Sequence, residues 1–141
     1  EVAHINIAAH GLEGRVQAIQ SDLFAALGAA HYDLIVTNPP YVDAGDMASL
    51  PGEFRHEPPL ALAAGQHGLD VIVRILAQTA LRLNPGGVLV AEVGNSRQAL
   101  QAAFPQVAFT WLIDSNGDES VFLLGAEDLA RHQARFAAFE K

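Results

Sequence analysis

The stretch from Asp33 to Tyr41, DLIVTNPPY, joins an apolar and largely β-branched run to a stiff polar turn. Asp33–Thr37 is typical of a strand that is covered on both faces of a parallel sheet, because such strands are almost continuously apolar. Asn38-Pro39-Pro40-Tyr41 follows at the carboxyl end of this strand, where open α/β sheets bind their ligands. The stretch therefore predicts an α/β fold with a functional site directly after the strand.

The rest of the chain alternates strand-like and helix-like runs, which favours one α/β domain with a parallel sheet. Further strands are expected over Val16–Gln20, Val88–Val93, Val107–Ile113 and Ser120–Leu124. Helices are expected over Val2–His10, Leu23–Leu27, Leu69–Leu83, Ser96–Ala103 and Ala126–Phe139, with Asn84-Pro85-Gly86-Gly87 ending the third. The last two strands flank Asn116-Gly117, a strong reversal signal, so we expect them to be antiparallel neighbours.

The composition excludes several classes of protein. A chain of 141 residues is long enough for one domain with one core. No apolar run approaches the roughly 18 residues that span a membrane, and the net charge of −8 disfavours an overall nucleic-acid-binding surface. Without cysteine there is no disulfide and no thiolate site, which suits the cytoplasm. The six histidines have no recognised ligand spacing, so we expect no metal.

The turn after the strand can hold a planar amino group. Each proline fixes its own φ, and Pro40 also keeps Pro39 out of the helical region, so the backbone carbonyls follow a stiff, extended path. The side-chain oxygen of Asn38 and the carbonyl oxygen of Pro39 are two acceptors that could bind both hydrogens of an –NH2 group. Tyr41 adds an aromatic face that suits a planar substrate or a cationic centre.

Such a pair of acceptors serves a specific kind of reaction. The nitrogen of an amide or exocyclic amine is a poor nucleophile because its lone pair is delocalised. Two aimed acceptors orient the nitrogen and favour the charge that develops on its hydrogens during attack. The partner must then be strongly electrophilic, as a sulfonium methyl group is.

Asn38-Pro39-Pro40-Tyr41 after a buried strand resembles the substrate motif of the amino-group methyltransferases that use S-adenosylmethionine and share a Rossmann-like fold. The expected terminal hairpin is similar to the last two strands of that fold. LPGEFRHEPPLALAAGQHGLD (Leu50–Asp70) and AEVGNS (Ala91–Ser96) resemble the protein-glutamine methyltransferases, in particular the type that methylates a large-subunit ribosomal protein. The resemblance runs from Glu1 to about Phe139.

The resemblance implies roles for individual residues. Asn38 and the Pro39 carbonyl match the catalytic pair that binds the target amide, and Pro40 and Tyr41 match the lining of that pocket. Asn38 and Asp22 match positions beside the methyl donor, Asp22 near its adenine amine, and Asp22 could also cap the expected helix at Leu23–Leu27, a role compatible with the first.

Three positions next to the site are less defined. Arg55, His56 and Glu57 match a loop beside the active site, where we assign only Glu57, as a substrate-side acceptor that orders the loop. Glu92 ends a strand, where either a ligand contact or a structural hydrogen bond would suit it.

The chain lacks two parts of the family's pattern. The Gly-rich turn and the ribose-binding acid that hold the donor are not in the sequence, and Gly86-Gly87 and Gly94 follow the wrong elements to replace them. The resemblance thus implies a class I methyltransferase domain truncated at its N-terminus, with residues 1–141 as a partial domain that lacks the first two strands and most of the S-adenosylmethionine site. We expect the open edge of Asp33–Thr37 either to pair with Val16–Gln20 or to drive self-association.

The function implied is methyl transfer from S-adenosylmethionine to a glutamine side-chain amide of a large-subunit ribosomal protein in the cytoplasm, with this chain inactive alone. Two enzymatic alternatives are methylation of a glutamine in peptide-chain release factors and of amino groups in nucleic acid, the latter disfavoured by the acidic charge. A non-catalytic α/β module is the alternative from another class. A membrane partner is not expected.

Overall fold

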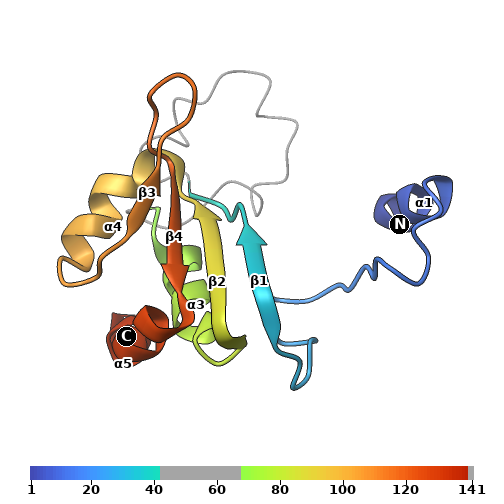
Figure 1. Cartoon of the computed structure of the whole chain (residues 1–141), viewed down its shortest axis with the longest axis horizontal. Helices are drawn as coiled ribbons and strands as arrows, with labels where there is room; N and C mark the ends of the chain where they lie inside the picture. Colours follow the sequence, from blue (N-terminus) through green and yellow to red (C-terminus); the bar gives the residue numbers. More distant parts are fainter. Residues whose placement is uncertain (42–67, 140–141) are drawn as a thin grey trace. The chain divides into compact units, whose positions relative to one another are not determined.

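The computed structural model describes residues 1–41 and 68–139 (Figure 1). The expected loop residues Arg55, His56 and Glu57 therefore lie outside the described residues. The chain forms two compact units, Glu1–Ala30 and His31–Lys141.

The first unit contains one helix, α1, over Val2–Ala9. Gly11, which follows it, has the left-handed φ of +61° that is common after a helix end, as the sequence predicted. Val16–Gln20 is not a strand, so this expectation was wrong. A strand needs a backbone partner, and no described segment is paired with these residues.

The expected helix over Leu23–Leu27 is a series of turns. The amides of Ala25 and Leu27 bond the carbonyls three residues earlier, at 3.1 Å each, and Leu23 has a positive φ of 49° that interrupts any helix. The Ser21 hydroxyl accepts a bond of 2.9 Å from the backbone amide of Ala26.

The second unit is built on a four-stranded mixed sheet with the order β1-β2-β4-β3 (Figure 1). Its strands are β1 (Tyr32–Thr37), β2 (Leu83–Glu92), β3 (Thr110–Leu112) and β4 (Val121–Gly125). β1 and β2 are parallel, whereas β4 is antiparallel to both β2 and β3. The α/β class and the terminal antiparallel hairpin that the sequence predicted are thus confirmed.

The expectation that β1 is covered on both faces was wrong. β1 is the edge strand of the described sheet, and the side chains of Leu34 and Val36 are 55% and 68% exposed. Because Leu34 and Val36 are two residues apart, they lie on the same face of the strand. Val16–Gln20, which the sequence offered as a partner for this edge, is not among the strands of the described sheet.

Two strand boundaries also differ from those expected. β2 begins at Leu83 and includes Asn84-Pro85-Gly86-Gly87, which the sequence assigned to the end of a helix. These residues are accommodated by an irregularity in the β1–β2 pairing, where Tyr32 is opposite Leu83 and Leu34 is opposite Val88. β3 is shorter than expected, because only the residues that face β4 are paired.

The described residues of this unit form the helices α3 (Asp70–Thr79), α4 (Arg97–Ala103) and α5 (Ala126–Phe139), with a 3-10 turn, η3, over Gly94–Ser96. α5 matches the sequence expectation at both ends, whereas α3 ends four residues early. α3 packs against α5, and α5 also packs against β2. The largest fully buried side chains, which form the core, are Phe122, Phe136, Ile72, Leu76, Leu89, Leu100, Leu124 and Leu129.

None of the described helices is long and apolar enough to cross a membrane.

Candidate functional site at the carboxyl end of the sheet

Asn38-Pro39-Pro40-Tyr41 leaves the sheet at the carboxyl end of β1, as the sequence predicted. Pro39 is buried and Asn38 is exposed, so the turn is anchored by a proline while the amide side chain faces solvent. The Asn38 side chain has no hydrogen bond to another described residue. The role of Asn38 in binding an amino group stays a prediction.

The turn after β2 reaches the same place, because the carboxyl ends of parallel strands lie at one edge of a sheet. Thr37 at the end of β1 pairs with Ala91, and the AEVGNS motif continues from there into η3. The Ser96 hydroxyl donates a hydrogen bond of 2.9 Å to the backbone carbonyl of Tyr41. Ser96 is only 6% exposed, so this bond is largely shielded from water.

Two glycines make this contact sterically possible. Gly94 has a φ of +48°, and a Cβ there would lie 2.5 Å from Cε2 and 2.8 Å from Cδ2 of the Tyr41 ring. Gly68 has a φ of +69°, and a Cβ there would overlap both the Ser96 hydroxyl and the Tyr41 carbonyl oxygen. Only glycine combines these backbone conformations with the absence of a side chain.

The phenol of Tyr41 lies in an environment that favours its neutral form. Partial burial raises the pKa of Tyr41, and the negative charge of Glu92 raises it further. Both effects disfavour a phenolate. Glu92 ends β2 and is half-buried, so it adds a carboxylate to the same edge of the sheet as Asn38.

Four of the predicted site residues lie together in the second unit. Asn38, Pro39, Pro40 and Tyr41 form one continuous turn in the second unit. Asp22 belongs to the first unit, where its backbone carbonyl accepts a bond of 3.1 Å from the amide of Ala25. Glu57 lies outside the described residues.

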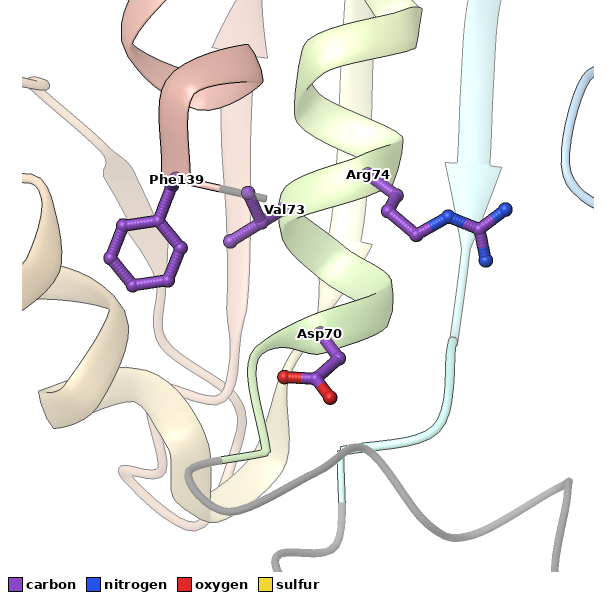
Figure 2. Close-up of a pocket in the computed structure, with 4 residues that line it drawn as sticks. All are labelled: Asp70, Val73, Arg74 and Phe139. Carbon is purple, nitrogen blue, oxygen red and sulfur yellow. The ribbon is translucent and has the colours of Figure 1, made fainter. Parts of the chain in front are cut away.

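A cavity of about 420 Å³ opens beside α3 (Figure 2). Its described lining residues are Asp70, Val73 and Arg74 of α3, and Phe139 at the end of α5. Figure 2 shows the Arg74 side chain directed away from Phe139. The cavity thus combines an apolar wall with a carboxylate and a guanidinium. Among residues 1–41 and 68–139, no group of acidic or histidine side chains could hold a metal ion.

Sequence reasoning did not assign a role to Ser96, Gly94 or Gly68. The signal was present, because the AEVGNS motif and the Gly68-Leu69-Asp70 helix start were both among the residues that carried the family resemblance. Gly94 was considered only as a donor-binding residue, whereas in the structure the Tyr41 ring covers it. A Cβ on Gly87 would be 3.0 Å from the Tyr32 carbonyl oxygen, whereas a Cβ on Gly86 would have no atom within 4 Å.

Comparison with known proteins finds similarity to methyltransferases. The family model described as "Methyltransferase small domain" matches residues 1–52. Proteins named "Ribosomal protein uL3 glutamine methyltransferase" are similar over most of the chain. The protein from Neisseria gonorrhoeae (strain ATCC 700825 / FA 1090) is 54% identical, covering 92% of this chain and 43% of the relative. The protein from Francisella tularensis subsp. tularensis (strain SCHU S4 / Schu 4) is 44% identical, covering 98% and 44%.

The chain therefore spans less than half the length of the curated relatives it matches. Within that span, the predicted resemblance to the protein-glutamine methyltransferases and the predicted Rossmann-like methyltransferase fold class are confirmed.

Proposed function

We propose that this homologue of the uL3 glutamine methyltransferases is part of an enzyme that transfers a methyl group from S-adenosylmethionine to the side-chain amide of a glutamine in ribosomal protein uL3. The chain contributes the half of the active site that recognises the amide. The observation that carries this proposal is the exposed side chain of Asn38, with no described hydrogen-bond partner, in a turn held at the carboxyl edge of the sheet.

In the proposed reaction, the amide NH2 of glutamine donates one hydrogen bond to the Asn38 side-chain oxygen and one to the Pro39 carbonyl oxygen. The nitrogen attacks the methyl carbon in line, so that an N–C bond forms and the C–S bond breaks. One proton passes from the nitrogen to water, and the products are N-methylglutamine and S-adenosylhomocysteine. The donor supplies an activated methyl group, and the chain's residues orient the nitrogen and stabilise its developing positive charge.

The donor side of the site is less complete in this chain. We assign Asp22 to the adenine amine and Asn38 to the methyl end, and Glu57 to ordering the adjacent loop. Neighbouring groups fill the space beside Gly87 and Gly94, so we assign neither glycine to binding of the donor. We therefore propose that residues 1–141 alone bind S-adenosylmethionine poorly and are inactive. Micromolar binding of S-adenosylmethionine to this chain in calorimetry would refute that part of the proposal.

The proposed protein partner suits the charge of the chain. A net charge of −8 favours encounter with a basic ribosomal protein and opposes approach to nucleic acid. Transfer of a labelled methyl group onto purified uL3, release factors or nucleic acid distinguishes the three substrates. Labelling of none of them by the full-length protein would instead support a non-catalytic α/β module.

Replacing Asn38 by alanine in the full-length protein tests the mechanism. We expect methyl transfer to fall by about 100-fold or more, because removing one aimed hydrogen-bonding group from a transition state costs on that order. Donor binding, measured by calorimetry, should change little. Asn84→Ala is the matched control, because Asn84 bonds the Asp33 carboxylate at 2.8 Å near the start of β1, away from the turn. Near-normal turnover of Asn38→Ala would remove Asn38 from the mechanism.

We also propose that the isolated chain self-associates through β1. The strand has a free backbone edge within the described sheet and two exposed aliphatic side chains, Leu34 and Val36, on one face. Val36→Lys should shift the chain toward monomer in sedimentation equilibrium. Leu81→Lys, at a 64% exposed residue outside β1, should not. A wild-type chain that is monomeric at all concentrations would contradict this proposal.

A further inference from the structure

We propose that Ser96 is a positioning residue for amide recognition: by holding the Tyr41 carbonyl, it fixes the direction in which Asn38 and Pro39 present their acceptors. The inference rests on the proposed function of the Asn38–Tyr41 turn. It adds to that function Ser96, a residue from the turn after β2 that acts through Tyr41.

Ser96 is itself held in place by backbone hydrogen bonds. Its amide bonds the Val93 carbonyl at 2.9 Å, and the amide of Val93 bonds the Ser120 carbonyl at 2.8 Å. Ser120 directly precedes β4, the strand that pairs with the other side of β2. A chain of hydrogen bonds thus connects the Ser96 hydroxyl to the centre of the sheet.

Tyr41 is held at two points, its backbone carbonyl and its ring. Ser96 bonds the Tyr41 carbonyl from 55 residues away in the sequence, and Gly68 packs against both partners of that bond. The Tyr41 ring lies on Gly94 at a distance that leaves no room for a Cβ. Tyr41 is therefore fixed at its carbonyl by Ser96 and at its ring by Gly94.

The position of Tyr41 restricts the position of Asn38. Pro39 and Pro40 have φ angles locked by their rings, so few torsions separate the Tyr41 carbonyl from the Pro39 carbonyl and the Asn38 side chain. A displacement of Tyr41 therefore also displaces the Pro39 carbonyl and the Asn38 side chain. Misplacing a reacting group by about 1 Å can lower a rate by about 100-fold.

The alternative is that Ser96 merely satisfies a buried hydroxyl, and kinetic constants of the full-length protein separate the two roles. We expect Ser96→Ala to lower kcat for glutamine methylation by roughly five- to tenfold, the rate equivalent of one partly buried hydrogen bond, with unchanged donor affinity. Ser96→Thr, which retains the hydroxyl, should recover most of the lost rate. Ser115→Ala, in the exposed turn between β3 and β4, is the matched control.

A second measurement uses the chain described here and needs no activity. Tyr32 and Tyr41 are its only tyrosines, so in a Tyr32→Phe background the ultraviolet absorbance of tyrosinate reports on Tyr41 alone. Release of Tyr41 should bring its raised pKa down toward the ordinary value near 10, because the ring gains water and moves away from Glu92. We expect this decrease in Ser96→Ala and not in Ser96→Thr.

The outcomes separate the inference from the function it rests on. If Asn38→Ala is inactive while Ser96→Ala has wild-type kcat and an unchanged Tyr41 pKa, the positioning role is wrong and the proposed function stands. If Asn38→Ala methylates glutamine normally, the proposed function fails whatever Ser96→Ala does. A loss of rate that Ser96→Thr does not restore would overturn the hydrogen-bond explanation.

Discussion

Replacing Gly94 by alanine tests how closely the Tyr41 ring lies on the turn after β2. The added Cβ would be 2.5 Å from Cε2, 2.8 Å from Cδ2 and 2.9 Å from Cζ of the ring. Carbon atoms in favourable contact are ~3.5–4.0 Å apart, so the ring has to move by roughly 1 Å. The substitution therefore acts on Tyr41 without changing any polar group of the proposed site.

The expected loss of stability has two parts. Alanine at a left-handed φ costs about 1–2 kcal/mol, and forcing a group into a filled space costs about 1–3 kcal/mol. Gly94→Ala should therefore lower the free energy of unfolding by about 2–5 kcal/mol. Gly117→Ala is the matched control: Gly117 also has a left-handed φ, +89°, but a Cβ there has no atom within 4 Å. It should cost about 1–2 kcal/mol only, from the backbone.

Urea unfolding measures the two free energies, and the absorbance titration of Tyr41 measures the displacement of the ring. We expect Gly94→Ala to bring the pKa of Tyr41 down toward its ordinary value, because a displaced ring is less buried and farther from Glu92. Gly117→Ala should leave that pKa unchanged. The reasoning is refuted if the two variants lose equal stability and Tyr41 titrates alike in both.

Two further predictions concern the scaffold around the site. Phe122 is fully buried, with its ring centroid 5.0 Å from that of Phe109 and 5.5 Å from that of Trp111. Phe122→Ala should therefore lower the free energy of unfolding in urea by about 3–5 kcal/mol. A decrease below about 1 kcal/mol would contradict this packing. Asp114 accepts bonds from the amides of Asn116 (2.8 Å) and Asp118 (2.9 Å), which lower its pKa. The stability that ionised Asp114 contributes is therefore full above the ordinary aspartate pKa near 3.9, and it is lost as the pH falls through the lowered pKa of the folded state. Asp114→Ala should flatten the dependence of the free energy of unfolding on pH below about 4.

The local pattern of the sequence was sufficient for much of the fold. α5 was placed at its observed ends because an amphipathic period extends over the whole segment. The turn between β3 and β4 was also predicted, and Gly117 has the left-handed φ that such a reversal needs. The Asn38–Tyr41 turn was placed correctly because β-branched residues followed by two prolines leave the backbone little choice.

Other features depended on partners that are distant in the sequence. Val16–Gln20 has the composition of a strand, yet it forms none, because a strand exists only when another strand bonds its backbone. Asn84-Pro85-Gly86-Gly87 looks like the end of a helix, but pairing with β1 draws it into β2. Both were assigned from local preference alone.

The sequence by itself determined the turn that carries the proposed acceptors, because the conformation of two prolines is set within the residues themselves. Only the tertiary structure decided what holds those acceptors in place. The contacts of Ser96, Gly94 and Gly68 with Tyr41 join segments far apart in the chain. They exist because parallel strands end at a common edge, which brings the turn after β2 beside the turn after β1.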